Sequence, residues 1–355
     1  MSTIYENEII ENKMTEILNT RLDTRALMTV DSSLSESAGL RKVINRYTYN
    51  GAVEFLAKGA KNRTKGTVSF VPEYYDVKRY QQTFEYNDMD AMADPYIVEV
   101  AMQGAVTEIS NEINKEYIDE ILKISNTFVY DDQTGLSYND IVDALATVDC
   151  EVDGELFMIM GAEARRDIRK NPDFVASKQG EIMNSGQFGT ICGIPVIFSK
   201  LMPASRVVVT SKDAVRFFVK KEASVEQARD IESKNNTIVY ERHGLIALVD
   251  DTHSVSIAKL PKTLDWTVTK EDGAAIFVFN GEQPDTTKYK YSILADLGKP
   301  SILEGDKVSV AGWYTVDINE GGAFTGNPDF KTATILETSL ETGRVTGIWY
   351  GEFND

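Results

Sequence analysis

The amino-acid sequence predicts an α+β protein that carries a small all-β domain at its carboxyl end. Apolar residues recur every four positions between residues 94 and 125, which indicates one long helix. Residues 128–260 then alternate short helical and strand-like segments. Beyond residue 260 only short strand-like runs occur, together with all three tryptophans and 11 of the 24 glycines.

Composition narrows the classes of function. The 355 residues include 37 Lys and Arg against 55 Asp and Glu, which gives a formal net charge of −18. The hydrophobic share of 42% is that of a folded globular chain. The acidic balance disfavours tight general binding to nucleic acid. The sequence has no apolar run of about 18 residues and no signal-peptide pattern, so we expect neither a membrane span nor export.

Two cysteines and two histidines limit metal and disulfide chemistry. Cys150 and Cys192 are expected to be reduced, buried thiols. Together with His243 and His253 they cannot assemble a zinc site of the usual Cys/His kind. We therefore expect no metal and no cofactor.

The first two segments are expected to project from a core. Residues 1–46 combine an amphipathic helical spacing with a polar stretch and are interpreted as an N-terminal arm. Residues 47–93 contain two strand-like runs around a Gly-bounded polar segment, which predicts a long β-hairpin and a following strand. The hairpin tip carries four positive charges, and it is either a solvated turn or an interaction site. These charges belong to Lys58, Lys61, Arg63 and Lys65.

Residues 94–127 are expected to form a spine helix. Asp94 is a suitable N-cap, and Pro95 suits the first helical position. A stripe of apolar residues follows at a spacing of four, and most charged residues lie off it. The stripe comprises Ile97, Ala101, Ala105, Ile109, Ile113, Tyr117 and Ile121.

Residues 128–260 are expected to mix helices and strands. Ser137 and Asp140 indicate a capping box before a helix over 138–147. Residues 155–160 are continuously apolar and predict a buried strand, which a helix over 162–170 follows. Ser211 is expected to cap a helix that runs through Phe218. The remaining predicted strands cover 191–198, 206–210, 237–240 and 245–249.

A domain boundary is expected near Leu260 and Pro261. Residues 261–355 contain five or more short strand-like runs between turn residues, with no helical pattern. This spacing predicts a small β-sandwich or barrel.

No catalytic set stands out in the sequence. His253 with Asp250 or Asp251 could form a hydrolytic pair, but no serine is marked as its nucleophile. The acidic pairs at 131–132 and 250–251 lack the further oxygen donors of a cation site. Glu151 and Glu155 are expected to flank a turn rather than to act as an acid and base pair. We therefore expect no enzyme activity.

Four segments, in this order, resemble the major capsid proteins of tailed bacteriophages. Residues 189–203 read GTICGIPVIFSKLMP and are similar to that family's G-x-x-x-G-x-P-V-x-x-S…P segment. Residues 207–217 resemble its strand leading into a short helix, 225–232 its V-E-x-x-R-D stretch, and 237–255 its closing strands. The resemblance covers about residues 1–260.

The resemblance implies the Hong Kong 97 phage-type capsid fold. Residues 48–87 would be an extended hairpin lying over a neighbouring subunit, and 94–125 the spine helix. Residues 128–260 would form the axial domain and the remaining strands of the peripheral domain. Residues 261–355 depart from the minimal family pattern and would be an added β-domain displayed on the shell surface.

The same resemblance implies the partners. The chain would assemble as pentamers and hexamers around double-stranded DNA, without specific nucleic-acid binding. A separate scaffolding protein and a portal would take part in assembly, which would occur in the bacterial host cytoplasm. The virion would be the final location.

Two alternatives remain open at this stage. A bacterial encapsulin-type nanocompartment shell has the same fold and would enclose cargo instead of a genome. An acidic hydrolase would use residues 261–355 as a carbohydrate-binding domain that exposes its tryptophans.

Overall fold

A computed structural model gives the architecture of the chain. It describes residues 14, 23–36, 38–94, 96–130, 135–148, 156–170, 190–271, 274–280, 285–295, 298–311, 313–315, 323–324 and 331–353. The chain divides into two compact units. Unit 1 comprises residues 1–124 and 210–254, and unit 2 comprises residues 125–209 and 255–355.

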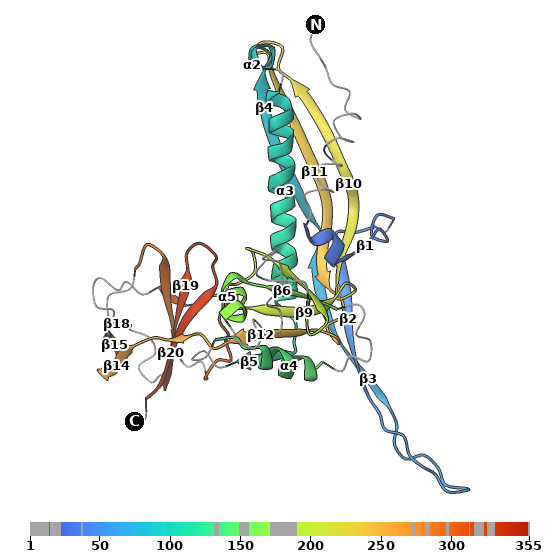
Figure 1. Cartoon of the computed structure of the whole chain (residues 1–355), viewed down its shortest axis with the longest axis vertical. Helices are drawn as coiled ribbons and strands as arrows, with labels where there is room; N and C mark the ends of the chain where they lie inside the picture. Colours follow the sequence, from blue (N-terminus) through green and yellow to red (C-terminus); the bar gives the residue numbers. More distant parts are fainter. Residues whose placement is uncertain are drawn as a thin grey trace. The chain divides into compact units, whose positions relative to one another are not determined.

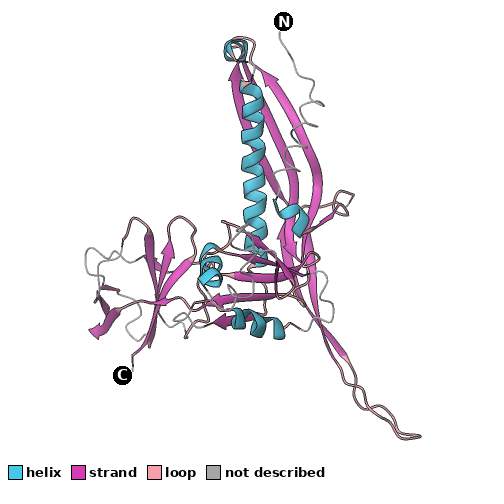
Figure 2. Cartoon of the chain, viewed as in Figure 1, coloured by secondary structure: helices cyan, strands magenta, loops and turns pink. Residues whose placement is uncertain are grey.

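Unit 1 is built on a four-stranded sheet with the order β1-β10-β11-β4 (Figures 1 and 2). The two long strands β10 (Val215–Arg229) and β11 (Asn235–Leu248) pair antiparallel along their length. Strand β4 (Lys78–Asn87) adds to β11, and the short β1 (Thr29–Asp31) adds in parallel to β10. The 3-10 helix η1 (Asp23–Leu27) precedes β1, and α2 (Asp88–Ala93) follows β4.

The spine helix is α3 (Ile97–Ile121), which packs against this sheet. The last five positions of the predicted stripe are buried, so this part of the helical pattern is confirmed. The predicted N-cap was wrong. Asp94 closes α2, and its carboxylate accepts a hydrogen bond from the backbone N–H of Tyr96, which is the N-cap of α3. Since α2 extends to Ala93, the chain turns after it and α3 begins only at Ile97. The helix is therefore 25 residues long and starts later than predicted.

The helix predicted from Ser211 to Phe218 was wrong. Residues 215–229 form β10, and the two strands predicted within 237–249 are one continuous β11. Val215, Phe217 and Val219 are all buried against the rest of unit 1. Residues 215–219 pair with β11 in continuous register, and this long-range partner overrides the local capping signal of Ser211.

The predicted hairpin is confirmed as β2 (Arg41–Asn50) and β3 (Thr67–Asp76), which form a two-stranded antiparallel sheet. Residues 51–66 connect the two strands. In Figure 1 this hairpin runs on beyond the four-stranded sheet of unit 1.

Unit 2 contains a six-stranded mixed sheet with the order β5-β12-β9-β6-β8-β7. Its strands are β5 (Thr127–Tyr130), β12 (Val255–Lys259), β9 (Val207–Ser211), β6 (Leu156–Met160), β8 (Ile194–Phe198) and β7 (Thr190–Ile191). Every residue of β6 is buried, as the apolar run predicted. The capping box of Ser137 and Asp140 is present at the start of α4 (Tyr138–Ala146), and α5 (Ala162–Lys170) has its predicted bounds.

Residues 261–353 contain strands and no helix where the structure describes them. One sheet has the order β13-β20-β19-β16-β17 and the other β14-β15-β18. The strands are β13 (Lys262–Thr263), β14 (Trp266–Glu271), β15 (Ala274–Phe279), β16 (Tyr289–Ala295), β17 (Tyr314–Thr315), β18 (Ala323–Phe324), β19 (Thr332–Ser339) and β20 (Val345–Glu352). Trp266, Tyr291 and Ile335 belong to the buried cluster of this segment.

A buried arginine ties this segment to the six-stranded sheet within unit 2. Arg206, which is 2% exposed, donates to the backbone oxygen of Glu304 at 2.8 Å and to Ser256 Oγ at 3.0 Å. It also forms an ion pair with Asp306. Arg344 donates to the backbone oxygen of Gly305 at 2.9 Å. The boundary near residue 260 is therefore crossed by charged contacts that the sequence did not indicate.

The prediction of two buried thiols was wrong for Cys192, which is exposed. Cys192 and Gly193 form the two-residue turn between β7 and β8, and both have positive φ, 53° and 81°. This turn geometry suits hairpins and directs its side chains away from the sheet. Cys150 lies outside the described residues. Within the described part of the chain, no helix is both long and apolar enough to cross a membrane.

Candidate assembly surface

The hairpin β2–β3 has one face that is mostly apolar and uncovered. Successive strand residues alternate between faces, and the register places Tyr47 opposite Phe70 and Tyr49 opposite Val68. Tyr47 is 69% exposed and Phe70 is 58% exposed, although their rings lie 6.1 Å apart. Val43 and Tyr74 continue the same exposed face toward the base of the hairpin. We call this the apolar hairpin face.

The base of the hairpin is fixed to unit 1. Ile44 and Tyr75, on the opposite face, are buried in a cluster with Phe218 of β10 and Leu245 of β11. Arg46 donates to Glu73 at 2.9 Å and lies 3.6 Å from Asp251. Two further contacts hold the first strand, since Arg41 pairs with Asp76 at 2.7 Å and Lys42 lies 4.2 Å from the Phe218 ring centroid. The exposed part of the hairpin is therefore presented from an anchored base.

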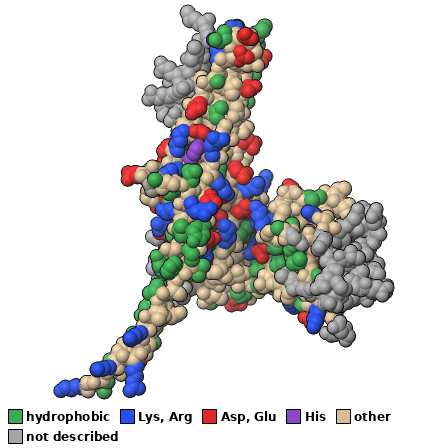
Figure 3. Space-filling view, turned by 180° about the vertical axis from the view of Figure 1, so that it is seen from behind, with side chains coloured by type: hydrophobic (Ala, Val, Ile, Leu, Met, Phe, Trp, Pro, Cys, Tyr) green, Lys and Arg blue, Asp and Glu red, His purple; other side chains and the backbone are tan. Residues whose placement is uncertain are grey.

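The tip of the hairpin, residues 51–66, contains the four basic residues that the sequence analysis named as a possible contact. The side chains of Lys58, Lys61, Arg63 and Lys65 are all exposed, and Figure 3 shows basic side chains gathered at this end. Val53, Phe55 and Leu56 are exposed beside them, with Phe55 fully so. The tip thus presents positive charge and apolar surface together.

Glu54 organises the tip, and sequence reasoning missed it. Its carboxylate accepts a hydrogen bond from the backbone N–H of Arg63 at 3.0 Å and another from the Thr64 hydroxyl. These bonds, the Thr64 hydroxyl first, lower the pKa of Glu54. The only sequence signal was an acidic residue just before a basic segment. Only the folded structure shows that the carboxylate bonds to residues on the other side of the loop.

Two of the catalytic candidates lie near each other, because the charge of His253 is among the causes, after the hydrogen bond from Thr252, that lower the pKa of Asp250. His253 and Asp250 are exposed, and Asp250 accepts hydrogen bonds from Thr252. His243 lies on β11, 3.4 Å from Glu241. In the described ranges no three His, Cys, Asp or Glu side chains are grouped to hold a metal ion. Residues 131–132, Glu151 and Glu155 lie outside the described residues.

No family model matches the sequence. A major capsid protein of Staphylococcus phage phiMR11 is 20% identical over 266 residues, covering 72% of this chain and 96% of the relative. The mature capsid of bacteriophage PhiM1 has a similar fold, with a TM-score of 0.52 and 12% identity over 66% of this chain and 86% of that one. The virus-like particle from Pyrococcus furiosus gives a TM-score of 0.50 and 12% identity over 70% and 98%.

These matches agree with the elements described above. A long hairpin, a spine helix against a four-stranded sheet, and a second mixed sheet occur in the order that the sequence resemblance implied. The curated relative is a major capsid protein, and it is matched over nearly its whole length. The chain has the Hong Kong 97 phage-type capsid fold, and its sequence is similar to that of a phage major capsid protein.

Proposed function

We propose that this chain assembles as pentamers and hexamers into the icosahedral shell of a tailed bacteriophage. The observation that carries the proposal is the apolar hairpin face, which no described part of unit 1 covers. Large apolar patches on a soluble chain mark interaction sites. A second copy of the chain is the partner that a closed, repeating shell supplies.

The arrangement suits assembly from many weak contacts. The anchored base sets the direction of the hairpin, and the exposed face and tip are left for a neighbour. Each contact can be modest, because a subunit in a closed shell is held at several sites at once. The positive tip would meet an acidic neighbouring surface, since the chain carries a net charge of −18, and this complementarity would speed encounter and set register.

The remaining roles follow from the same proposal. The shell would enclose double-stranded DNA without specific nucleic-acid recognition, and a scaffolding protein and a portal would take part in its assembly in the host cytoplasm. The mature protein would reside in the virion. Residues 261–355 would be displayed at the shell surface. The chain itself is structural and not an enzyme.

A compartment shell without a genome is the second candidate. It is favoured by the fold match to the virus-like particle from Pyrococcus furiosus. Portal and terminase genes beside the coding sequence would support the phage shell, and a cargo-enzyme gene would support the compartment. The carbohydrate-binding alternative requires exposed tryptophans. Trp266 is buried, so its ring cannot stack on a sugar.

The test replaces Tyr47 and Phe70 by Ser and expresses the chain with its genomic neighbours. We expect particles to be lost while the subunit stays folded, because these side chains contribute to no intrachain core. Leu340→Ser is the control, since Leu340 is also exposed but lies in the turn after β19. Particles are counted by negative-stain microscopy. Normal particle yield from the double variant would refute the role of the hairpin face.

A further inference from the structure

The last turn of α3 lies beside the base of the hairpin in unit 1. One turn earlier, Glu116 forms an ion pair with Lys78 of β4 at 2.8 Å and accepts a hydrogen bond from the Tyr80 hydroxyl. Strand β3 runs on into β4, so the next helical turn reaches the level of β3. Lys123 Nζ accordingly lies 5.6 Å from the centroid of the Tyr75 ring. We call this region the helix–hairpin junction, and it comprises Glu116, Glu120 and Lys123 at the end of α3 with Glu73 and Tyr75 of β3.

Glu120 is a buried carboxylate with one unpaired oxygen. The residue is only 8% exposed. Its Oε1 accepts a hydrogen bond from Lys123 Nζ at 2.5 Å, whereas its Oε2 is buried and has no hydrogen-bond partner. An ionised oxygen that is removed from water without a donor raises the free energy of the folded state. Glu120 also lies in the last turn of α3, where the helix dipole disfavours a negative charge.

Tyr75 connects Glu120 to the hairpin. Its hydroxyl is also buried without a hydrogen-bond partner. Its ring belongs to the cluster with Ile44, Phe218 and Leu245 that holds the base of the hairpin. Burial, and after it the charge of Glu120, raise the pKa of Tyr75. The charge of Glu120 therefore acts on a side chain that anchors the hairpin.

Neighbouring carboxylates oppose the charge of Glu120. Glu73 and Glu116 both repel it. Lys123 attracts it, but the side chain of Lys123 is 47% exposed, so water screens this ion pair. Other charged and titratable groups near the junction are bonded to partners of their own: Arg46 of β2 to Glu73 and Asp251, Lys78 and Tyr80 of β4 to Glu116, Arg242 and His243 of β11 to Glu222 and Glu241, and Glu112 of α3 to Lys115.

These surroundings give the pH dependence its direction. Burial first, and the charges of Glu73 and Glu116 after it, raise the pKa of Glu120 above its ordinary value of 4.5, although Lys123 lowers it. The folded chain therefore binds this proton more tightly than the unfolded chain does. The folded state gains stability as the pH falls through the raised pKa toward 4.5, and at higher pH the cost of the charge is complete. Opening of the junction would hydrate the carboxylate, so the pH dependence is expected there.

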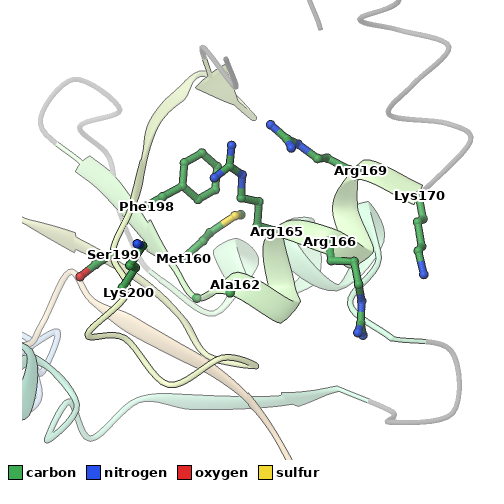
Figure 4. A pocket seen from close by; sticks show the side chains of 10 residues that line it. Met160, Ala162, Arg165, Arg166, Arg169, Lys170, Phe198, Ser199 and Lys200 are labelled. Carbon is green, nitrogen blue, oxygen red and sulfur yellow. The ribbon is translucent and has the colours of Figure 1, made fainter. Parts of the chain in front are cut away.

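The basic pocket of unit 2 supplies no comparable group among the residues that the structure describes around it. It has a volume of about 740 Å³ and is formed by the end of β6, by α5 and by the end of β8 (Figure 4). The guanidinium of Arg165 lies 4.0 Å from the centroid of the Phe198 ring. The ten described lining residues include five Lys and Arg but no Asp, Glu or His. Lysine and arginine stay protonated between pH 4.5 and 8, so this pocket is not expected to respond in that interval.

We propose that Glu120 makes the attachment of the hairpin to the spine helix depend on pH. The ionised carboxylate loosens the base of the hairpin at neutral pH, and the neutral carboxyl tightens it in acid. This inference deepens the proposed shell function, on which its consequence for assembly rests. The base sets the direction of the hairpin, so a change of pH would alter how firmly the apolar hairpin face is presented to a second copy.

The experiment follows backbone hydrogen exchange of dissociated subunits by mass spectrometry between about pH 4.5 and 8, with each rate corrected for that of an unstructured peptide. In the unaltered chain the protection of residues 41–46 and 72–77 should fall by about twofold or more as the pH rises. Glu120→Gln carries no charge, so its protection should stay at the acid value throughout. Glu112→Gln is the control, because the side chain of Glu112 is 63% exposed on the same helix, and it should show the fall of the unaltered chain. His243 is present in all of these chains, so its own titration cancels from the comparison.

A second variant tests the opposite direction. Lys123→Met removes the cation bonded to Glu120 and should enlarge the fall in protection, since the carboxylate then has less compensation. An equal or smaller fall would contradict the inference.

Three further outcomes would overturn it. If Glu120→Gln keeps the pH dependence of the unaltered chain, Glu120 is not the responsible group. A change confined to residues 118–122 would show that only the helix end frays, and an equal change at all protected amides of unit 1 would show a global loss of stability. These measurements need no particles. An unaltered chain that never forms particles with its genomic neighbours would therefore refute the shell function and leave the hydrogen-exchange result standing.

Discussion

Replacing Asp306 by Ala is expected to destabilise unit 2 more than replacing its partner Arg206 by Met. Arg206 is 2% exposed, so the alanine variant leaves a guanidinium charge inside the protein without its carboxylate. The side chain of Asp306 is 31% exposed, so in the methionine variant water can hydrate the carboxylate that remains. The two substitutions remove the same ion pair but leave different residues behind.

The magnitudes follow from what stays unpaired. Removing one partner of a buried pair costs about 3–5 kcal/mol, and access of water to the site lowers this to about 2–4 kcal/mol for Asp306→Ala. Arg206→Met removes the charge at similar volume but leaves Ser256 Oγ and the Glu304 backbone oxygen without their donor, which costs about 1–3 kcal/mol. The double variant should resemble Arg206→Met, because no charge is then left to compensate, and should differ from it only by the lost hydrogen bond from the Leu303 N–H to Asp306 at 2.9 Å.

The assay is urea unfolding of dissociated subunits. Trp266, Trp313 and Trp349 all lie beyond residue 260, so their fluorescence reports on the segment that Arg206 holds. We expect the order of stability to be unaltered chain, then Arg206→Met together with the double variant, then Asp306→Ala. If Asp306→Ala unfolds at the same urea concentration as the unaltered chain, the ion pair does not stabilise unit 2 and the reasoning fails.

Three further predictions concern unit 1. Ile113→Asp should lower the free energy of unfolding by about 4 kcal/mol or more and unfold the subunit, since Ile113 is 0% exposed on α3. Circular dichroism measures the loss of structure, and Val100→Asp, at an exposed position of the same helix, is the control. Reversing Lys61, Arg63 and Lys65 to Glu should reduce particle yield by about tenfold, because we propose that the tip docks on another copy. The melting temperature should not change, since these side chains are exposed. Equal yield would count against docking of the tip. Glu241 accepts a hydrogen bond from Lys221 and lies 3.4 Å from His243. The bond from Lys221 is the largest cause that lowers the pKa of Glu241 from 4.5 to about 2. Its stabilising contribution is therefore complete above pH 4.5 and is lost as the pH falls toward 2. The gap in unfolding free energy between the unaltered chain and Glu241→Gln should close over that interval, and a gap that does not depend on pH would contradict this assignment.

Local periodicity in the sequence predicted the elements whose burial pattern is regular. The four-residue spacing of Ile109, Ile113 and Tyr117 predicted the buried face of α3, and the apolar run at 156–160 predicted β6. Alternating residues on both sides of a polar, Gly-bounded segment predicted the hairpin and gathered its four cations at one end. These features depend on neighbours in the sequence, so no knowledge of distant contacts was needed.

Tertiary contacts decided the points at which local signals were ambiguous or absent. Ser211 is an acceptable helix cap, yet pairing with β11 made the following residues a strand. Asp94 has the residue type of an N-cap for α3, yet in the structure it is the C-cap of α2. Arg165 and Phe198 meet only because α5 follows β6 and β8 pairs beside it.

The sequence by itself determined the secondary elements with a regular period, the acidic balance and the basic tip of the hairpin. Only the tertiary structure decided which hairpin face is uncovered and that Arg206 reaches Asp306, 100 residues further along the chain. It also decided that two arginines of α5 share a pocket with Phe198. The physical reason is that periodicity records which side of an element is buried, whereas the partner that buries it, or leaves it open, is set by contacts between distant segments.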